Sequence, residues 1–317
     1  MNILIAGELN VDLVLHNYQS FPRLGHEVLV EEVSLTLGSS SAICAAGLAK
    51  LGNRAIFVGM LGCDSWGDLV LESLDRLAVD ASHVIRDPAI KTGLTVSITS
   101  ARDRALVTYL GSIAALREDA IQDAWFEGCR HLHVSSFFMQ KGLRPGLKRL
   151  LTRAHGFGLT TSIDPGFDPA EAWEHDLLDA LEETDLFLPN EVELSGATGI
   201  GNPAEALRAL DNGHTRTVVK LGAAGSATLE NGEVLRVPAF AIEPLDTTGA
   251  GDSFNAGFLD AWLRGRSILE SMRIGAACGA LSTQGLGGTA AQPSESQVEE
   301  FLAANSPEPA VHSEARL

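Results

Sequence analysis

The chain has 317 residues, of which 45% are hydrophobic and 20% are charged, so it can bury a large core in one domain with an appendage or in two domains. Its net charge of −18 argues against a nucleic acid or an anionic membrane as a partner, because either would require a basic face. No apolar run approaches the roughly 20 residues of a membrane span, and the N-terminal segment predicts a buried strand instead of a signal peptide, so we expect a cytoplasmic protein.

The first predicted element is a strand over residues 3–7, an apolar run typical of parallel strands that are buried on both faces. The polar string from Gly7 to Asp12 leaves that strand at its carboxyl end, where ligands bind in open α/β sheets. Its Gly-x-x-Asn-x-Asp pattern differs from a dinucleotide-binding fingerprint. Taken alone, the string predicts either a ligand-binding loop or an ordinary polar loop.

Three segments show the period-two alternation of half-exposed strands: residues 33–37, 94–99 and 105–109. The polar residues 100–104 join the last two segments into a predicted hairpin. We therefore expect a small antiparallel sheet, separate from the main fold.

The other segments predict a larger sheet. A glycine-serine turn and a helix of small residues are expected over 38–52, followed by a buried strand over 55–62. From Arg130 onward, apolar strands at 131–134, 159–164, 186–188 and 217–220 alternate with helical stretches, which indicates a parallel sheet covered on both faces. His131 and His133 lie on one of these strands, and we expect core histidines in preference to metal ligands.

The four cysteines show no CxxC pair, and we expect small buried residues in a reducing cytosol. They are Cys44, Cys63, Cys129 and Cys278.

The stretch from Asp246 to Arg264 is the most informative. A glycine-rich turn leads into a helix whose apolar face is formed by Phe254, Phe258, Ala261 and Trp262. Such a helix start binds anions, because its free N–H groups and its dipole point toward the ligand. Asp252 stands at this point, either as a base for an attacking hydroxyl or as the N-cap, and the dipole is expected to keep it ionised at neutral pH.

The string Asp-Thr-Thr-Gly-Ala-Gly-Asp, residues 246–252, resembles the signature of the ribokinase-like (PfkB) carbohydrate kinases. The strings at 7–12, 62–67, 190–193 and 220–225 are similar to further motifs of that family, in the family's order. The resemblance implies an α/β three-layer sandwich with a central, mostly parallel sheet, formed by residues 1–12, 37–91 and 112–305. It also implies a β-sheet lid over the sugar, formed by residues 13–36 and 92–111. The polar tail 306–317 is expected to be disordered.

The resemblance further implies ATP-dependent phosphoryl transfer to a sugar, with Mg²⁺ and K⁺ as cofactors and a homodimer formed through the lid. The sequence contains no P-loop, HRD–DFG pair, HExxH or G-x-S-x-G motif that would indicate another class of enzyme. The resemblance implies that the catalytic base is Asp252 and that the anion hole is formed by Gly249, Ala250 and Gly251. The implied substrate residues are Asn10, Asp12, Gly38 and Ile43, and the implied nucleotide residues are Lys220, Gly222, Gly225 and Thr247. Mg²⁺ would be held through water by Asn190 and Glu193, and a monovalent cation would be held by Asp246, Thr248, Ser282 and Gly285.

One position departs from the family pattern. Ile43 stands where the family has an asparagine that contacts the sugar. This difference removes one polar contact with the substrate, so the identity of the sugar is not determined by the resemblance. A nucleoside kinase of the same family is the alternative, since Ile43 could face a base. A non-catalytic sugar or nucleotide sensor on this fold is the alternative from another class.

Overall fold

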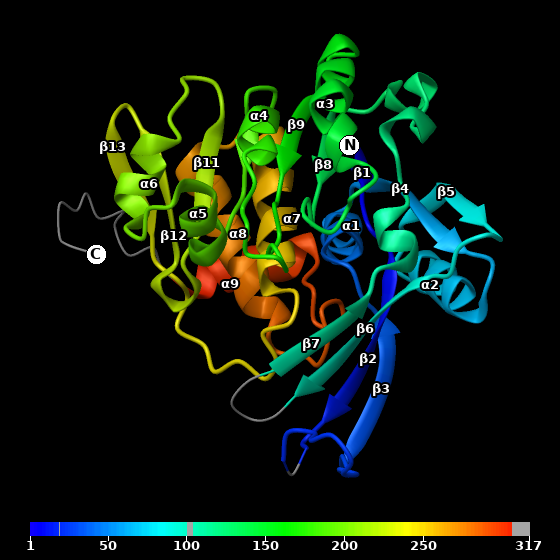
Figure 1. Cartoon of the computed structure of the whole chain (residues 1–317). Coiled ribbons are helices and arrows are strands. Elements are labelled where there is room, and N and C mark those ends of the chain that lie inside the picture. Colours follow the sequence, from blue (N-terminus) through cyan, green and yellow to red (C-terminus); the bar gives the residue numbers. More distant parts are fainter. Residues whose placement is uncertain (19, 100–103, 306–317) are drawn as a thin grey trace.

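The computed structural model describes residues 1–18, 20–99 and 104–305, and within these ranges the strands form two separate sheets (Figure 1). The predicted hairpin turn and the predicted disordered tail fall largely or wholly outside the described residues. The larger sheet contains β1 (Asn2–Ala6), β4 (Arg54–Gly62), β5 (Asp80–Asp87), β8 (His131–Val134), β9 (Thr160–Ile163), β10 (Leu186–Phe187), β11 (Arg216–Lys220), β12 (Ser226–Glu230) and β13 (Glu233–Val237). The smaller sheet contains β2 (Asn10–His16), β3 (Glu32–Leu37), β6 (Gly93–Thr99) and β7 (Arg104–Tyr109).

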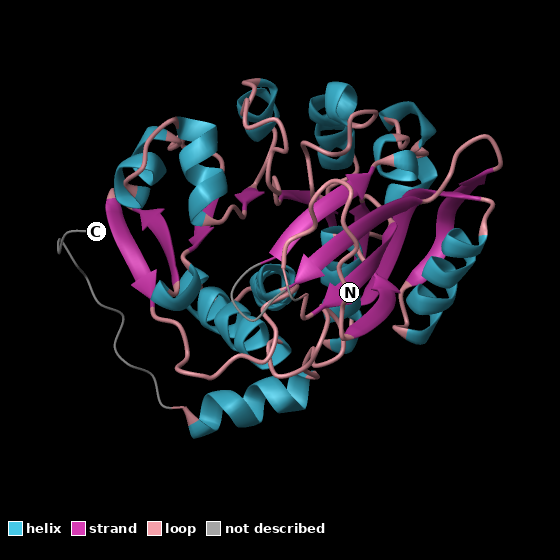
Figure 2. Cartoon of the chain, turned by 60° about the horizontal axis from the view of Figure 1, so that its bottom comes forward, coloured by secondary structure: helices cyan, strands magenta, loops and turns pink. Residues whose placement is uncertain are grey.

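Helices lie on both sides of the larger sheet (Figure 2). They are α1 (Ser40–Lys50), α2 (Ser65–Arg76), α3 (Leu147–Gly156), α4 (Asp176–Leu181), α5 (Glu191–Thr198), α6 (Pro203–Ala209), α7 (Ala250–Leu263), α8 (Ile268–Ser282) and α9 (Glu295–Ala304). Short 3₁₀ turns occur at Gly111–Ala114, Glu118–Ala120, Asp123–Phe126, Arg144–Gly146 and Gly222–Ala224. None of the helices described is long and apolar enough to cross a membrane.

The larger sheet has the order β13-β12-β11-β10-β9-β8-β1-β4-β5 and is parallel except for β12 and β13 at one edge. The interior strand β1 shows why the predicted apolar run is continuous. Ile3 and Ile5 of β1 pack into the core shared with α1, α2, α7 and α8, whereas Leu4 and Ala6 pack into the core shared with α3 and α4. The prediction of an α/β sandwich with a mostly parallel sheet and a small second sheet is therefore confirmed. The expectation that the second sheet is antiparallel is wrong at its centre, because β2 and β6 pair in parallel.

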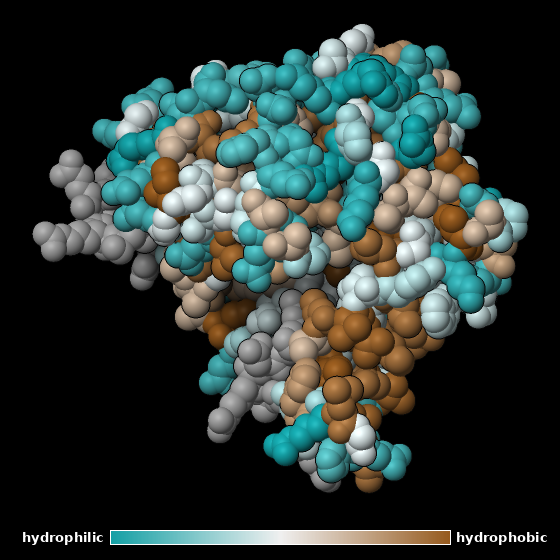
Figure 3. All heavy atoms as spheres, viewed as in Figure 1, coloured by the Kyte–Doolittle hydropathy of each residue, from teal (hydrophilic) through white to brown (hydrophobic). Residues whose placement is uncertain are grey.

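The smaller sheet has one polar face and one apolar face. Its order is β3-β2-β6-β7, and the register places Leu13, Leu35, Val96 and Val107 on the same face. Leu35 is 43% exposed and Val107 is 62% exposed, and Figure 3 shows the apolar surface that these strands present. The opposite face carries Asp12 beside the hydroxyls of Thr36, Thr95 and Thr108.

The prediction for the cysteines is correct at three positions and wrong at one. Cys44, Cys129 and Cys278 are buried, but Cys63 is exposed. The reason is that β4 ends at Gly62, and the chain then turns outward to begin α2, whose N-cap is Asp64.

The two histidines of β8 are core residues, as predicted. His131 donates to or accepts from Thr160 and Ser162, and His133 is bonded to Ser162 and Ser135. Burial lowers the pKa of His131 well below its usual range and lowers the pKa of His133 to about 4. Both rings are therefore neutral at pH 7.

Candidate active site

The predicted glycine turn and helix are present, and the helix begins where the anion site was expected. Gly249 is the N-cap of α7 and has a left-handed backbone (φ 71°), which favours glycine. Asp252 lies inside the first turn, so the alternative prediction of Asp252 as the N-cap is wrong. The N–H of Ala250 donates to the carbonyl of Thr247 (3.2 Å), so an anion would have to displace this bond to use that group.

Lys220 lies directly beside this helix start. A Cβ atom built on Gly251 would be 3.6 Å from Lys220 Nζ. The ammonium donates to Asp164 Oδ2 (2.7 Å) and to Asn255 Oδ1 (3.3 Å), and Asn255 also donates to Asp164. Asp164 follows β9 and Asn255 lies on α7, so three elements hold one buried network.

Lys220 and Asp164 each stabilise the charged form of the other. Burial raises the pKa of Asp164, but Lys220 and Asn255 outweigh this effect and leave the pKa below its ordinary value. Burial lowers the pKa of Lys220, and Asp164 and Glu193 reverse that shift. Both groups are therefore charged at neutral pH, and the Lys220 ammonium is a fixed positive charge next to Asp252 and the turn.

The electrostatic surroundings of Asp252 differ from the prediction. The side chain keeps some contact with solvent, but protein surrounds most of it, and this burial raises its pKa well above the ordinary value. Asp164 raises the pKa further, whereas Lys220 lowers it. Burial and the neighbouring acids therefore act against the helix dipole, which was expected to keep Asp252 ionised.

Three predicted substrate residues come together where the smaller sheet meets the core. Asn10 Nδ2 donates to Asp12 Oδ1 (2.8 Å), and both side chains lie on β2. A Cβ atom on Gly38 would be 2.3 Å from both of these atoms, so any larger residue would have to displace these two side chains. The resulting group of polar atoms lies at the carboxyl end of β1.

Ile43 lies next to the anion turn. The side chain is 5% exposed, and its Cγ2 would be 3.0 Å from a Cβ atom on Gly249. On its other side, Ile43 Cδ1 would be 2.5 Å from a Cβ atom on Gly288. Gln292 fixes this arrangement, since its amide donates both to the Ile43 carbonyl (2.8 Å) and to Ser253 Oγ (3.1 Å).

The predicted magnesium residues form a capping box at the start of α5. Asn190 Oδ1 accepts from the Glu193 N–H (2.9 Å), and Glu193 Oε2 accepts from the Asn190 N–H (2.8 Å). Glu193 is buried, and burial together with Asp164 raises its pKa to about 7. A divalent cation near Glu193 would favour the charged form of its carboxyl group and so offset the effects of burial and of Asp164. Glu193 therefore fits a divalent-cation site.

The predicted monovalent-cation residues join two loops. Asp246 accepts from the N–H groups of Thr248 (2.9 Å) and Gly287 (2.8 Å), and its own N–H donates to the Thr283 carbonyl (3.1 Å). Ser282 is different, because its hydroxyl donates to the Gly279 carbonyl of the same helix (2.8 Å). A Cβ atom on Gly285 would be 2.8 Å from Ala291 Cβ, so the second loop lies close to the chain that follows it.

The remaining nucleotide residues lie in the turn between β11 and β12 and in the loop before α7. Gly222 and Gly225 both have left-handed backbones (φ 57° and 91°), and a Cβ atom on Gly225 would be 2.0 Å from the Val237 carbonyl. Thr247 is exposed. Across the described residues, no group of three or more His, Cys, Asp or Glu side chains could hold a metal ion.

The sequence prediction missed Asp164 and Asn255. Asp164 follows the apolar strand β9 and precedes Pro165 and Gly166, which is the same strand-end position that singled out Asn10 and Asn190. That signal could have found it. Asn255 gave no signal of its own, because a single asparagine within a helix has no distinctive pattern.

Comparison with known proteins identifies the family of the chain. The family model described as "pfkB family carbohydrate kinase" matches residues 1–295. This chain belongs to the pfkB family of carbohydrate kinases. It is therefore an ATP-dependent carbohydrate kinase that phosphorylates a sugar.

Individual pfkB relatives match the chain over nearly its whole length. It is 25% identical to a ribokinase of Haemophilus influenzae, over 94% of this chain and 97% of the relative. It is 24% identical to a deoxyribokinase of Salmonella typhi, over 96% of this chain and 100% of the relative. The solved structure of Arabidopsis thaliana ribokinase complexed with ribose and ATP is 26% identical and superposes with a TM-score of 0.81, covering 94% of this chain and 97% of that one.

Proposed function

We propose that this kinase transfers the γ-phosphoryl group of ATP to a hydroxyl of a small sugar, with Asp252 as the general base and the Gly249–Gly251 turn as the anion hole. The observation that carries the proposal is that the Asp252 carboxyl, the Lys220 ammonium and the first turn of α7 meet at one place. A base, a fixed positive charge and a helix N-terminus are what this transfer requires.

The chemistry is mainly positioning and charge stabilisation. As the acceptor oxygen bonds to phosphorus, its proton passes to Asp252 and the bond to the leaving ADP oxygen breaks. Lys220 and the N–H groups of Gly249 and Gly251 face the negative charge on the transferring group, with Ala250 joining them if its bond to Thr247 opens.

The acceptor is proposed to lie between Asp252 and the group formed by Asn10, Asp12 and Gly38. The polar face of the smaller sheet continues from Asp12, which supports a lid that covers the sugar. ATP is proposed to bind along Lys220, Gly222, Gly225 and Thr247. Mg²⁺, held through water by Asn190 and Glu193, would neutralise phosphate charge.

The test is ATP consumption by the purified protein across a panel of sugars and nucleosides. Sugar-dependent formation of ADP supports the proposal. A preference for nucleosides would favour the alternative of a nucleoside kinase. Binding of these ligands without turnover, with Mg²⁺ present, would favour a sensor.

The environment of Ile43 predicts the class of sugar. A hydroxyl directed at this apolar side chain would lose water without gaining a partner, which costs about 1–3 kcal/mol. We therefore expect a deoxy sugar, or a molecule with an apolar face, to be preferred over ribose and fructose. Ile43→Asn should shift the ratio of kcat/KM values toward the hydroxylated sugars. Wild-type preference for ribose, with ratios unchanged in the variant, would contradict it.

The ion requirements can be tested on the same assay. Activity is expected to vanish with EDTA and to return with Mg²⁺, because Glu193 is buried near Asp164 and needs a counter-charge. K⁺ is expected to raise the rate further, since Asp246 joins the two loops of its proposed site. Equal rates with K⁺ and with a large organic cation, at matched ionic strength, would exclude the monovalent site.

We also propose a homodimer that forms through the apolar face of the smaller sheet. Leaving Leu35 and Val107 in water is unfavourable, and a second copy would cover them. Leu35→Glu is expected to convert a dimer into a monomer in light scattering coupled to gel filtration. Leu106→Glu is the matched control, because Leu106 is also exposed but lies on the other face of β7. A monomeric wild type would refute the dimer.

A further inference from the structure

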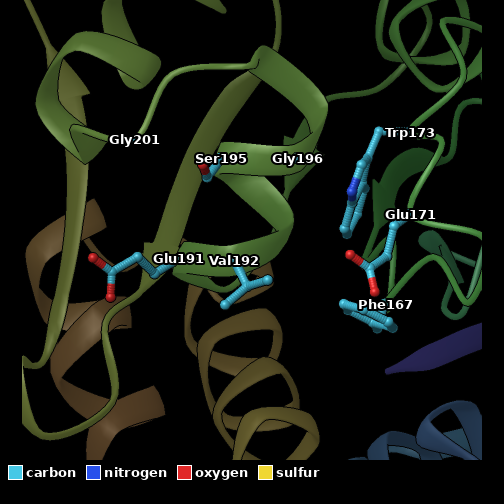
Figure 4. A pocket seen from close by; sticks show the side chains of 8 residues that line it. All are labelled: Phe167, Glu171, Trp173, Glu191, Val192, Ser195, Gly196 and Gly201. Atoms are coloured by element: carbon cyan, nitrogen blue, oxygen red, sulfur yellow. The ribbon is translucent and has the colours of Figure 1, made fainter.

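A pocket of about 410 Å³ lies between the loop that follows β9 and the helix α5 (Figure 4). Phe167 and Trp173 of the loop form one wall, and Val192 of α5 forms the other. Glu171 and Glu191 also line it, and we call this site the aromatic pocket. None of the roles proposed above uses these five residues.

The apolar part of the aromatic pocket is open to solvent. Phe167 is 50% exposed and Val192 is 58% exposed. The rings of Phe167 and Trp173 are nearly perpendicular, with centroids 5.7 Å apart, so they offer faces in two directions. An occupant that touches both rings would remove this apolar surface from water.

The loop is shaped to hold these side chains. The buried Asp168 carboxylate accepts N–H bonds from Ala170 (3.0 Å), Ala172 (2.9 Å) and Trp173 (2.8 Å). Trp173 itself rests against α5, where a Cβ atom on Gly196 would be 2.2 Å from its ring. The pocket wall is therefore pre-organised, which reduces the ordering cost of binding.

The charge in the aromatic pocket is negative. In Figure 4 the Glu171 carboxylate lies near the two rings, whereas Glu191 extends from the start of α5 on the side away from them. Neither carboxylate forms an ion pair with any residue that the structure describes, and none of the lining residues is basic. Aromatic faces attract cations, and unpaired carboxylates add to that attraction, whereas they repel phosphates and acids.

We propose that the aromatic pocket binds a small organic cation, of the substituted-ammonium class, as a ligand distinct from ATP and the sugar. The aromatic pocket lies beside elements that also carry active-site residues. The loop begins at Asp164, the partner of Lys220, and Val192 immediately precedes Glu193. A cation held between the loop and α5 would contact both elements that position these acids. This proposal is independent of the phosphoryl-transfer mechanism.

The experiment uses choline as the probe and, as its control, the neutral alcohol in which a tert-butyl group replaces the trimethylammonium group. The chain has four tryptophans, so ¹⁵N labelling of tryptophan gives four indole N–H signals, and the spectrum of Trp173→Phe identifies that of Trp173. We expect choline to shift the Trp173 signal saturably and the neutral alcohol to shift it much less.

Two variants at exposed positions test the site while leaving Trp173 itself in place. Phe167→Leu and Glu171→Gln are each expected to weaken choline binding about two- to fivefold, the size of one exposed cation–π contact or ion pair. Glu72→Gln, an exposed change on α2, should leave binding unchanged. Equal shifts with choline and the alcohol, or wild-type affinity in both pocket variants, would overturn the proposal, whatever the kinase assay shows.

Discussion

Asp252→Asn is expected to lower turnover by about two to four orders of magnitude while leaving ATP binding nearly unchanged. The amide has nearly the same shape as the carboxylate but cannot accept the hydroxyl proton. The helix start, Lys220 and the glycine turn all remain, so the nucleotide keeps its contacts. Single-turnover rates and ATP affinity, measured side by side, check both halves of this expectation.

The pH dependence gives a second measurement on the same variant. A base works only when deprotonated, so wild-type activity should rise with pH as Asp252 loses its proton. Burial raises the pKa of Asp252, so this rise should lie well above the range of an ordinary aspartate. The residual activity of Asp252→Asn should lack the part of that rise that comes from Asp252, whereas any part that comes from Glu193, whose pKa is raised to about 7, should remain.

The control for Asp252→Asn is Asp75→Asn, the same change at an exposed position on α2. It should leave the rate and its pH profile unaltered. Turnover of Asp252→Asn within a few-fold of wild type would remove Asp252 from the mechanism.

The parts of the fold that could be predicted from the sequence are those set by local pattern. The apolar run of β1 indicates a doubly covered strand, which is present. The spacing of Phe254 and Phe258 indicates a helix with one apolar face. The helix is present, but the one-sided burial is wrong, because α7 is buried over the consecutive residues 253–261. The alternation in residues 33–37 and 94–99 likewise predicts the strands of the second sheet. It does not show that Val33 and Leu35 lie on an exposed face, since exposure depends on what covers the sheet.

The parts of the site that could not be predicted depend on contacts between distant segments. The resemblance gave Lys220 as a nucleotide residue, but its bond to Asp164 spans 56 residues and leaves no local pattern. The raised pKa of Asp252 has the same origin. A helix start is visible in the sequence, whereas the burial that raises the pKa comes from the surrounding elements.

Lys220→Met is expected to reduce both stability and turnover. The side chains of Lys220 and Asp164 are 13% and 7% exposed, so removing the ammonium leaves a buried carboxylate without its cation. Breaking such a pair by deleting one partner costs about 3–5 kcal/mol of the free energy of unfolding. The loss of a fixed positive charge beside Gly251 should also lower turnover by about two to three orders of magnitude.

The double variant Lys220→Met/Asp164→Asn separates these two effects. Because the second change removes the unpaired charge, most of the lost stability should return in urea unfolding. Turnover should stay low, since no positive charge faces the transferring phosphoryl group. If turnover instead recovers together with stability, Lys220 serves only to neutralise Asp164, and the positive charge at the anion hole must come from elsewhere.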